Sequence, residues 1–144
     1  MSQTQSAKSW RVLVVDDEPH IPAIAAHKFA EVGMQVVGVG SAEEALCMLR
    51  RGHFDLAIVD YHLCGTDGVQ LCQSMLSEPR LAQVPVLLLT GQAHALTEQH
   101  LAATNIRMII TKPFSPSELL RRASELIEEA RHGEDPDSGL AAAA

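Results

Sequence analysis

The stretch "LAIVDYHLCGTDG", residues 56–68, decides the fold. Its first four residues are apolar and lead directly into a carboxylate, Asp60, which is followed by a polar loop that contains glycine. A continuous apolar run of this length is typical of a strand buried on both faces, as in a parallel sheet. A single acid after such a strand is most often a solvated loop residue. Whether Asp60 has a function must therefore be judged from the residues that follow the other strands.

Short apolar runs of the same kind alternate with longer segments that have helical spacing. The predicted strands cover residues 12–15, 36–39, 56–59, 86–89 and 108–110. Strict alternation of strands and helices predicts an α/β fold in which helices cover both faces of one parallel sheet.

Residues typical of helix N-termini support the prediction of helices in two of the segments with helical spacing. Ser41 is followed by Glu44, and Ser115 by Glu118, which is the spacing of a capping box. Pro116 then occupies the first position of the last helix, where its missing N–H costs nothing.

Three further helices rest on weaker patterns. One lies between the first two strands, and its predicted buried stripe is Ile21, Ile24, Ala25, Phe29 and Val32. The other two are expected near residues 69–77 and 95–103.

The length of 144 residues indicates one domain, for which we expect the bounds 10–131. Residues 1–9 are expected to be a flexible N-terminus. Residues 132–144 are expected to be a flexible tail or linker stub, because Gly133 and Pro136 should interrupt any helix.

The composition argues against binding to nucleic acid and against insertion into a membrane. The net charge of −7 disfavours binding to polyanions, and no apolar run is long enough to span a bilayer. Cys47, Cys64 and Cys72 are an odd set without C-x-x-C spacing, which fits free thiols in a reducing compartment. With no signal peptide at the start of the chain, we expect a cytoplasmic location.

Polar residues follow four of the five predicted strands. Asp16 and Asp17 follow the first strand, Asp60 follows the third and Thr90 the fourth. The fifth strand is followed by Thr111 and Lys112. The carboxyl ends of parallel strands form one edge of the sheet, where ligands bind. We therefore expect three carboxylates, a hydroxyl and an ammonium to lie together.

This set suits one kind of chemistry. Three carboxylates and one ammonium leave a charge of −2, which one Mg²⁺ would balance while keeping water and phosphate as further ligands. A carboxylate can then attack phosphorus, while Lys112 and Thr90 hold the oxygens of the phosphoryl group. The set predicts phosphorylation of an aspartate.

The ordered motifs "VLVVDDEP", "LAIVD" with "GTDG", "VLLLTG" and "TKPF" resemble the receiver domain of bacterial two-component response regulators, single-domain chemotaxis regulators included. The resemblance covers roughly residues 10–131. It implies a flavodoxin-like doubly wound five-stranded parallel sheet of order 2-1-3-4-5 with five helices. It also implies a signalling switch rather than an enzyme, one that catalyses only its own phosphorylation and dephosphorylation.

The resemblance implies a role for each acid. Asp60 would be the phosphoacceptor and a ligand of Mg²⁺. Asp17 would bind Mg²⁺ directly, Asp16 largely through water, and His62 through its backbone carbonyl. The effect of the His62 side chain is left open among screening of the phosphoryl group, orientation of the hydrolytic water and no effect.

Around the phosphoryl group, the resemblance implies that Thr90 is the switch hydroxyl and that the backbone N–H of Gly91 lies beside it. Lys112 would contact the phosphoryl oxygens, and the Lys112–Pro113 bond would be cis. Three positions depart from the family pattern: Ile109 stands where receivers usually carry Tyr or Phe, Cys64 where Pro is frequent, and Gly91 where Ala is more usual.

The expected partners are a histidine kinase or phosphotransfer protein and a downstream protein that contacts the fourth helix, fifth strand and fifth helix. Homodimer formation is left open, as are the cognate kinase, the signal and the output. Two alternatives remain: an interaction module that signals without phosphorylation, and a receiver cut from a larger regulator or hybrid kinase. A phosphatase or dehalogenase would need a cap or a second acid, and a flavin site would need a phosphate-binding loop.

Overall fold

The computed structural model describes residues 9–91, 101–102 and 104–134. Its centre is a five-stranded sheet of β1 (Arg11–Val15), β2 (Gln35–Val39), β3 (Leu56–Asp60), β6 (Val86–Thr90) and β7 (Ile106–Thr111). The order is β2-β1-β3-β6-β7, and every neighbouring pair is parallel. Numbered along these strands alone, the order is 2-1-3-4-5, so the predicted fold is confirmed.

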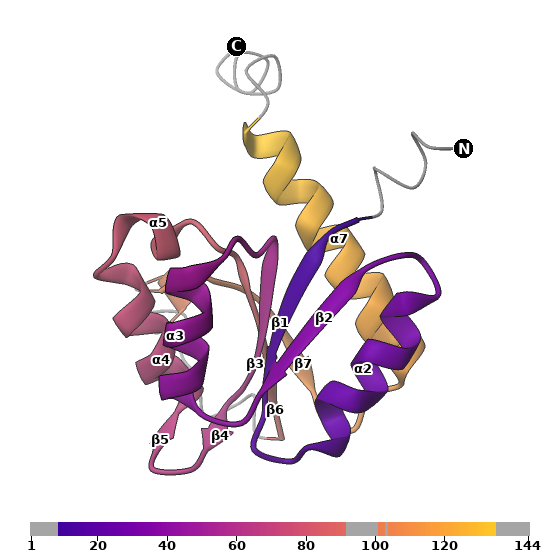
Figure 1. Cartoon of the computed structure of the whole chain (residues 1–144), viewed down its shortest axis with the longest axis horizontal. Helices are drawn as coiled ribbons and strands as arrows, with labels where there is room; N and C mark the ends of the chain where they lie inside the picture. The colour runs from indigo at the N-terminus through magenta and orange to yellow at the C-terminus, as the bar shows by residue number, and fades with distance from the viewer. Residues whose placement is uncertain (1–8, 92–100, 103, 135–144) are drawn as a thin grey trace.

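Helices cover both faces of the sheet (Figure 1). On one face lie α2 (His20–Ala30) and α7 (Pro116–Glu134), and on the other α3 (Ala42–Arg51), α4 (Gly68–Leu76) and the short α5 (Pro79–Ala82). The helix expected near residues 95–103 falls almost entirely outside the described residues. No helix in the described ranges is long and apolar enough to cross a membrane.

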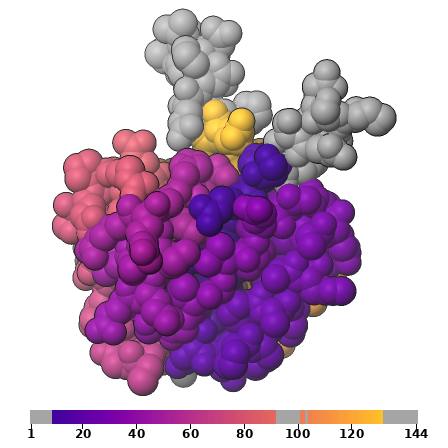
Figure 2. All heavy atoms as spheres, in the orientation of Figure 1, coloured from indigo at the N-terminus to yellow at the C-terminus, as the bar shows by residue number. Residues whose placement is uncertain are grey.

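The alternation of side chains along the strands divides the core into two layers. In β1, Val12 and Val14 pack in the layer that contains Phe29 of α2, whereas Leu13 and Val15 pack in the layer beneath α3 and α4. Every residue of β3 and β6 is buried. Cover on both faces explains why these strands are continuous apolar runs. In Figure 2, residues of α2 and α3, coloured indigo to magenta, form the surface around the edge strand β2.

Both predicted helix caps are present. The Ser41 hydroxyl accepts a hydrogen bond from the Glu44 N–H at 3.1 Å, and the Ser115 hydroxyl accepts one from the Glu118 N–H at 3.0 Å. The Glu44 carboxylate accepts from the N–H of Gly40 at 2.8 Å, one residue earlier than a standard capping box requires.

Two short features were not predicted from the sequence. After β3 the chain forms a hairpin of β4 (His62–Leu63) and β5 (Thr66–Asp67), with Gly65 at φ 80° in its turn. The helix α5 is only four residues long. Elements of two to four residues are too short to show a hydrophobic period.

Two predictions were wrong in detail. The last helix continues through Gly133 to Glu134, because one glycine near a helix end costs only about 1 kcal/mol relative to alanine. Ile24, predicted in the buried stripe of α2, is 42 % exposed, while Ala25 and Phe29 of the same stripe are buried. The spacing of apolar residues shows which side of a helix faces the core, but it overestimates how wide the buried side is.

Candidate functional site

The polar strand ends meet at the carboxyl edge of the sheet, as predicted. Asp60 and Thr90 are the last residues of β3 and β6, while Asp16 and Asp17 follow β1 and Lys112 follows β7. One carboxylate oxygen from each of the three aspartates lies within 4.8 Å of the others. The Lys112 Nζ lies 3.0 Å from Asp60 Oδ1.

The three acids differ in exposure. Asp16 and Asp60 are 1 % and 4 % exposed, whereas Asp17 is exposed. Burial raises the pKa of Asp16. The Glu18 N–H donates a hydrogen bond to Asp16 Oδ1 at 2.9 Å, which lowers the pKa but does not outweigh the burial. The nearby charge of Asp60 raises the pKa of Asp16 further, and Lys112 opposes it. The cluster therefore holds more negative charge than its surroundings neutralise.

Two buried oxygens test whether a cation fits here. Among the described residues, Asp16 Oδ2 and Asp60 Oδ1 accept no hydrogen bond, although Asp60 Oδ1 has Lys112 at ion-pair distance. Buried acceptors without partners are costly, and carboxylate oxygens are the ligands that Mg²⁺ prefers. The set of Asp16, Asp17 and Asp60 fits Mg²⁺. A cavity of about 370 Å³ opens beside Asp16 and Asp17.

The two residues expected to flank the phosphoryl group have different surroundings. Thr90 is 1 % exposed, and its carbonyl accepts the N–H of Lys112 at 2.8 Å, which ties the ends of β6 and β7 together. Gly91 is exposed, and a methyl group added to it would meet no described atom within 4 Å. The Lys112–Pro113 bond is cis, as the resemblance implied.

The loop after Asp60 is held at both ends by backbone hydrogen bonds. The Tyr61 N–H donates to the carbonyl of Leu89 at 2.8 Å, and the Tyr61 carbonyl accepts the N–H of Gly68 at 2.7 Å. His62 is exposed, and its ring lies edge-on to that of Tyr61 with centroids 4.9 Å apart. Sequence reasoning missed the part played by Gly68, although the quoted "GTDG" contains it.

Ile109 and Cys64, two of the three departures from the family pattern, lie in different surroundings. Ile109 of β7 pairs with Leu88 and is partly buried against the core layer beneath α3 and α4. Cys64 is an exposed free thiol in the β4–β5 turn. Neither position takes a chemical group away from the acid cluster.

Curated relatives are regulators about twice as long. The chain is 31 % identical over 137 residues to a probable transcriptional regulator ycf27 of Porphyridium aerugineum, covering 90 % of this chain and 55 % of the relative. It is 26 % identical to the phosphate regulon transcriptional regulatory protein PhoB of Rhizobium meliloti (strain 1021), covering 84 % and 53 %. The chain thus spans about half the length of these relatives.

Solved structures of response regulators resemble this chain in sequence and in fold. A putative response regulator from Chloroflexus aurantiacus is 28 % identical with a TM-score of 0.72, covering 83 % of this chain and 98 % of its own. The chemotaxis response regulator CheY4 of Vibrio cholerae is 25 % identical with a TM-score of 0.75, covering 81 % and 98 %. A family model described as response regulator receiver domain matches residues 12–124. The chain belongs to the response regulator receiver domain family.

Proposed function

We propose that this chain is a phosphorylation-controlled switch of two-component signalling, in which Asp60 accepts a phosphoryl group from a histidine kinase or phosphotransfer protein. One observation carries the proposal: Asp60 ends a fully buried strand, beside two further acids and 3.0 Å from the Lys112 ammonium. A solvated loop aspartate would have neither the burial nor these neighbours.

Asp16, Asp17 and Asp60 would hold Mg²⁺, with the backbone carbonyl of His62 as a further ligand. Bound there, Mg²⁺ would offset the negative charge that otherwise repels a phosphoryl group. An Asp60 oxygen attacks phosphorus, the bond from phosphorus to the donor's imidazole nitrogen breaks, and the imidazole takes up a proton. The product is an acyl phosphate, which water later hydrolyses to phosphate and the free carboxylate.

The other residues bind the phosphoryl oxygens. Phosphorylation moves negative charge outward from the Asp60 carboxylate, so Lys112 changes partner from a carboxylate oxygen to a phosphoryl oxygen. The Thr90 hydroxyl and the Gly91 N–H donate to the remaining oxygens. Because the Lys112 N–H already bonds the Thr90 carbonyl, movement at either residue passes to both strands.

The output proposed here is a protein contact through β7, α7 and the segment before β7. Phosphorylation biases a two-state equilibrium of this surface, and the partner binds the phosphorylated state better. A cytoplasmic location agrees with a histidine kinase as donor. The set of Asp16, Asp17, Asp60, Thr90 and Lys112 supports the switch over a module that signals without phosphorylation.

The test is incubation with acetyl phosphate, followed by intact-mass measurement. We expect one added phosphoryl group in the presence of Mg²⁺ and none after chelation with EDTA. The matched variant Asp60→Asn keeps the shape of the side chain without the nucleophilic carboxylate, and it should stay unlabelled. Equal labelling of both proteins would reject Asp60 as the acceptor.

A further inference from the structure

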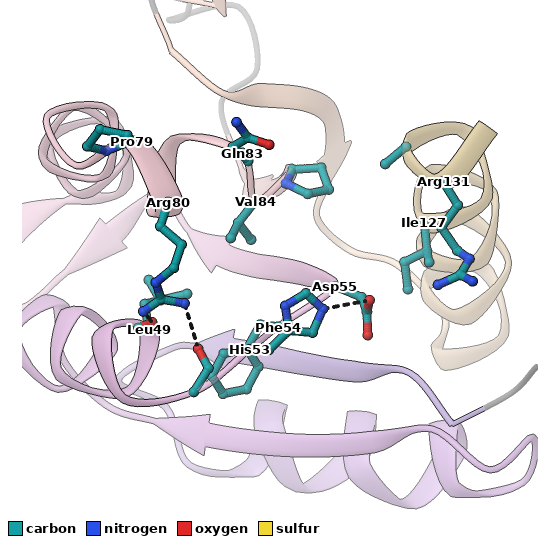
Figure 3. A pocket seen from close by; sticks show the side chains of 13 residues that line it. Leu49, His53, Phe54, Asp55, Pro79, Arg80, Gln83, Val84, Ile127 and Arg131 are labelled. Carbon is teal, nitrogen blue, oxygen red and sulfur yellow. Dashed lines mark hydrogen bonds and ion pairs between the residues drawn. The ribbon is translucent and has the colours of Figure 1, made fainter. Parts of the chain in front are cut away.

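A second cavity, of about 490 Å³, is drawn in Figure 3. It lies beside the amino ends of β3 and β6, at the other end of the strands from Asp60. Three separate parts of the chain line it: the end of α3 with the loop to β3, α5 with the loop to β6, and the last turns of α7. None of its lining residues belongs to the acid cluster. A volume of several hundred Å³ is typical of sites for small organic molecules.

The apolar walls of this amino-edge cavity belong to the packed core. Leu49 of α3, Phe54 before β3 and Ile127 of α7 are 1 %, 3 % and 0 % exposed. Val84 and Pro85 add an apolar side at the start of β6. Side chains held this firmly do not collapse into the space, so the cavity is preformed.

Two arginines lie on opposite sides of the cavity (Figure 3). The guanidinium of Arg80 donates to the carbonyls of Leu49 at 2.7 Å, Arg50 at 2.9 Å and Gly52 at 3.3 Å. A guanidinium has five N–H donors, so donors remain for a ligand. Arg131 has no hydrogen-bond or ion-pair partner in the described part of the chain.

The cavity wall itself carries more positive than negative charge, although Glu78, which pairs with Arg50 outside the lining, lies near Arg80. Asp55 is the only acid among the described residues that line the cavity. Its Oδ2 accepts the N–H of Arg11 at 2.9 Å, and its Oδ1 pairs with His53 Nε2 at 3.2 Å. A cationic, partly apolar cavity therefore stands out in a chain whose net charge is −7.

We propose that the amino-edge cavity binds a small organic anion in which a flat aromatic ring carries a carboxylate, sulfonate or phosphate. The ring packs against Val84 and Ala130, which are partly exposed in the cavity, and the acidic group accepts hydrogen bonds from Arg80 and Arg131. This ligand would be a second input to the domain, at the other end of the strands that carry Asp60. The site does not depend on the proposed phosphorylation, so either can fail alone.

The probe is 2-naphthoate, titrated into the full chain while amide NMR shifts are followed. We expect saturable shifts in residues 52–55, 80–85 and 127–131, with smaller changes next to Asp60. Arg131→Gln should weaken binding about tenfold or more, because it removes a charge-assisted hydrogen bond. The control is Arg121→Gln on the same helix, outside the cavity and paired with Glu125, which should leave affinity unchanged.

A second probe, neutral 2-naphthamide, separates anion recognition from apolar packing. It should bind at least about tenfold more weakly than 2-naphthoate, since the guanidinium groups attract the carboxylate. The proposal is overturned if the amide binds as tightly, if Arg121→Gln weakens binding as much as Arg131→Gln, or if millimolar 2-naphthoate shifts no amide of the cavity.

Discussion

Gly68 lies directly against the backbone of Asp60. A methyl group added to Gly68 would come within 2.7 Å of the Asp60 carbonyl oxygen, 2.9 Å of Leu88 Cδ1 and 3.0 Å of Val59 Cγ1. The Gly68 N–H also donates to the Tyr61 carbonyl. The first residue of α4 therefore holds the backbone at Asp60, the proposed phosphoacceptor, in place.

Gly68→Ala should displace Asp60 because a backbone oxygen cannot move aside as a flexible side chain can. Overpacking of this kind costs about 1–3 kcal/mol in the free energy of unfolding. We expect this loss in urea denaturation, together with a roughly tenfold slower reaction with acetyl phosphate, which corresponds to about 1.4 kcal/mol of barrier. The control is Gln73→Ala, an exposed position on the same helix that has no part in the proposed site. Equal behaviour of the two variants would contradict a positioning role for Gly68.

Lys112→Ala should slow phosphorylation and spare Mg²⁺ binding. Loss of a hydrogen bond to a charged group costs about 1.5–3 kcal/mol, roughly a ten- to hundredfold lower rate. Removal of the ammonium leaves three carboxylates without their cation, so the affinity for Mg²⁺ should stay equal or rise. The rate of reaction with acetyl phosphate and a Mg²⁺ titration followed by the amide NMR shifts of Asp16, Asp17 and Asp60 check both. An unchanged rate with weakened Mg²⁺ binding would show that Lys112 orders the acids instead.

Ile109→Tyr should change association more than chemistry. Ile109 is partly buried on β7, at the edge of the sheet, and it has no ring that could rotate inward when Thr90 moves. A tyrosine there enlarges the surface proposed for output and leaves the acids untouched. Sedimentation of the phosphorylated and unphosphorylated protein measures self-association, and acetyl phosphate measures the rate. A strongly altered rate with unaltered association would refute this division of roles.

Cys72 should resist alkylation, in contrast to the other two cysteines. Its side chain is 0 % exposed, and burial raises the pKa of the thiol to about 12, with a further contribution from the charge of Asp67. The reactive thiolate is therefore scarce at pH 8 and would become common only as the pH approaches 12. Iodoacetamide at pH 8 should modify Cys47 and Cys64 in the folded protein and all three cysteines in urea. Three adducts on the folded protein would contradict the packing beneath α4.

The acid cluster could be predicted from the sequence because a strand buried on both faces is a continuous apolar run, and the first polar residue marks its end. Asp60 and Thr90 mark such ends, and parallel topology then brings them to one edge. The position of Gly68 relative to Asp60 could not be predicted, because the contact depends on how α4 returns to the sheet. The amino-edge cavity was also beyond prediction, since residues 49–55, 79–85 and 127–131 share no pattern.

Chemical trapping of the acyl phosphate tests the role of Asp60 most directly. Borohydride reduces an aspartyl phosphate to homoserine but leaves a free carboxylate unchanged, so peptide sequencing by mass spectrometry locates the modified residue. After incubation with Mg²⁺ and acetyl phosphate, we expect homoserine at position 60 alone, and none when Mg²⁺ is chelated. Homoserine at position 16 or 17, or no homoserine under any condition, would contradict Asp60 as the phosphoacceptor.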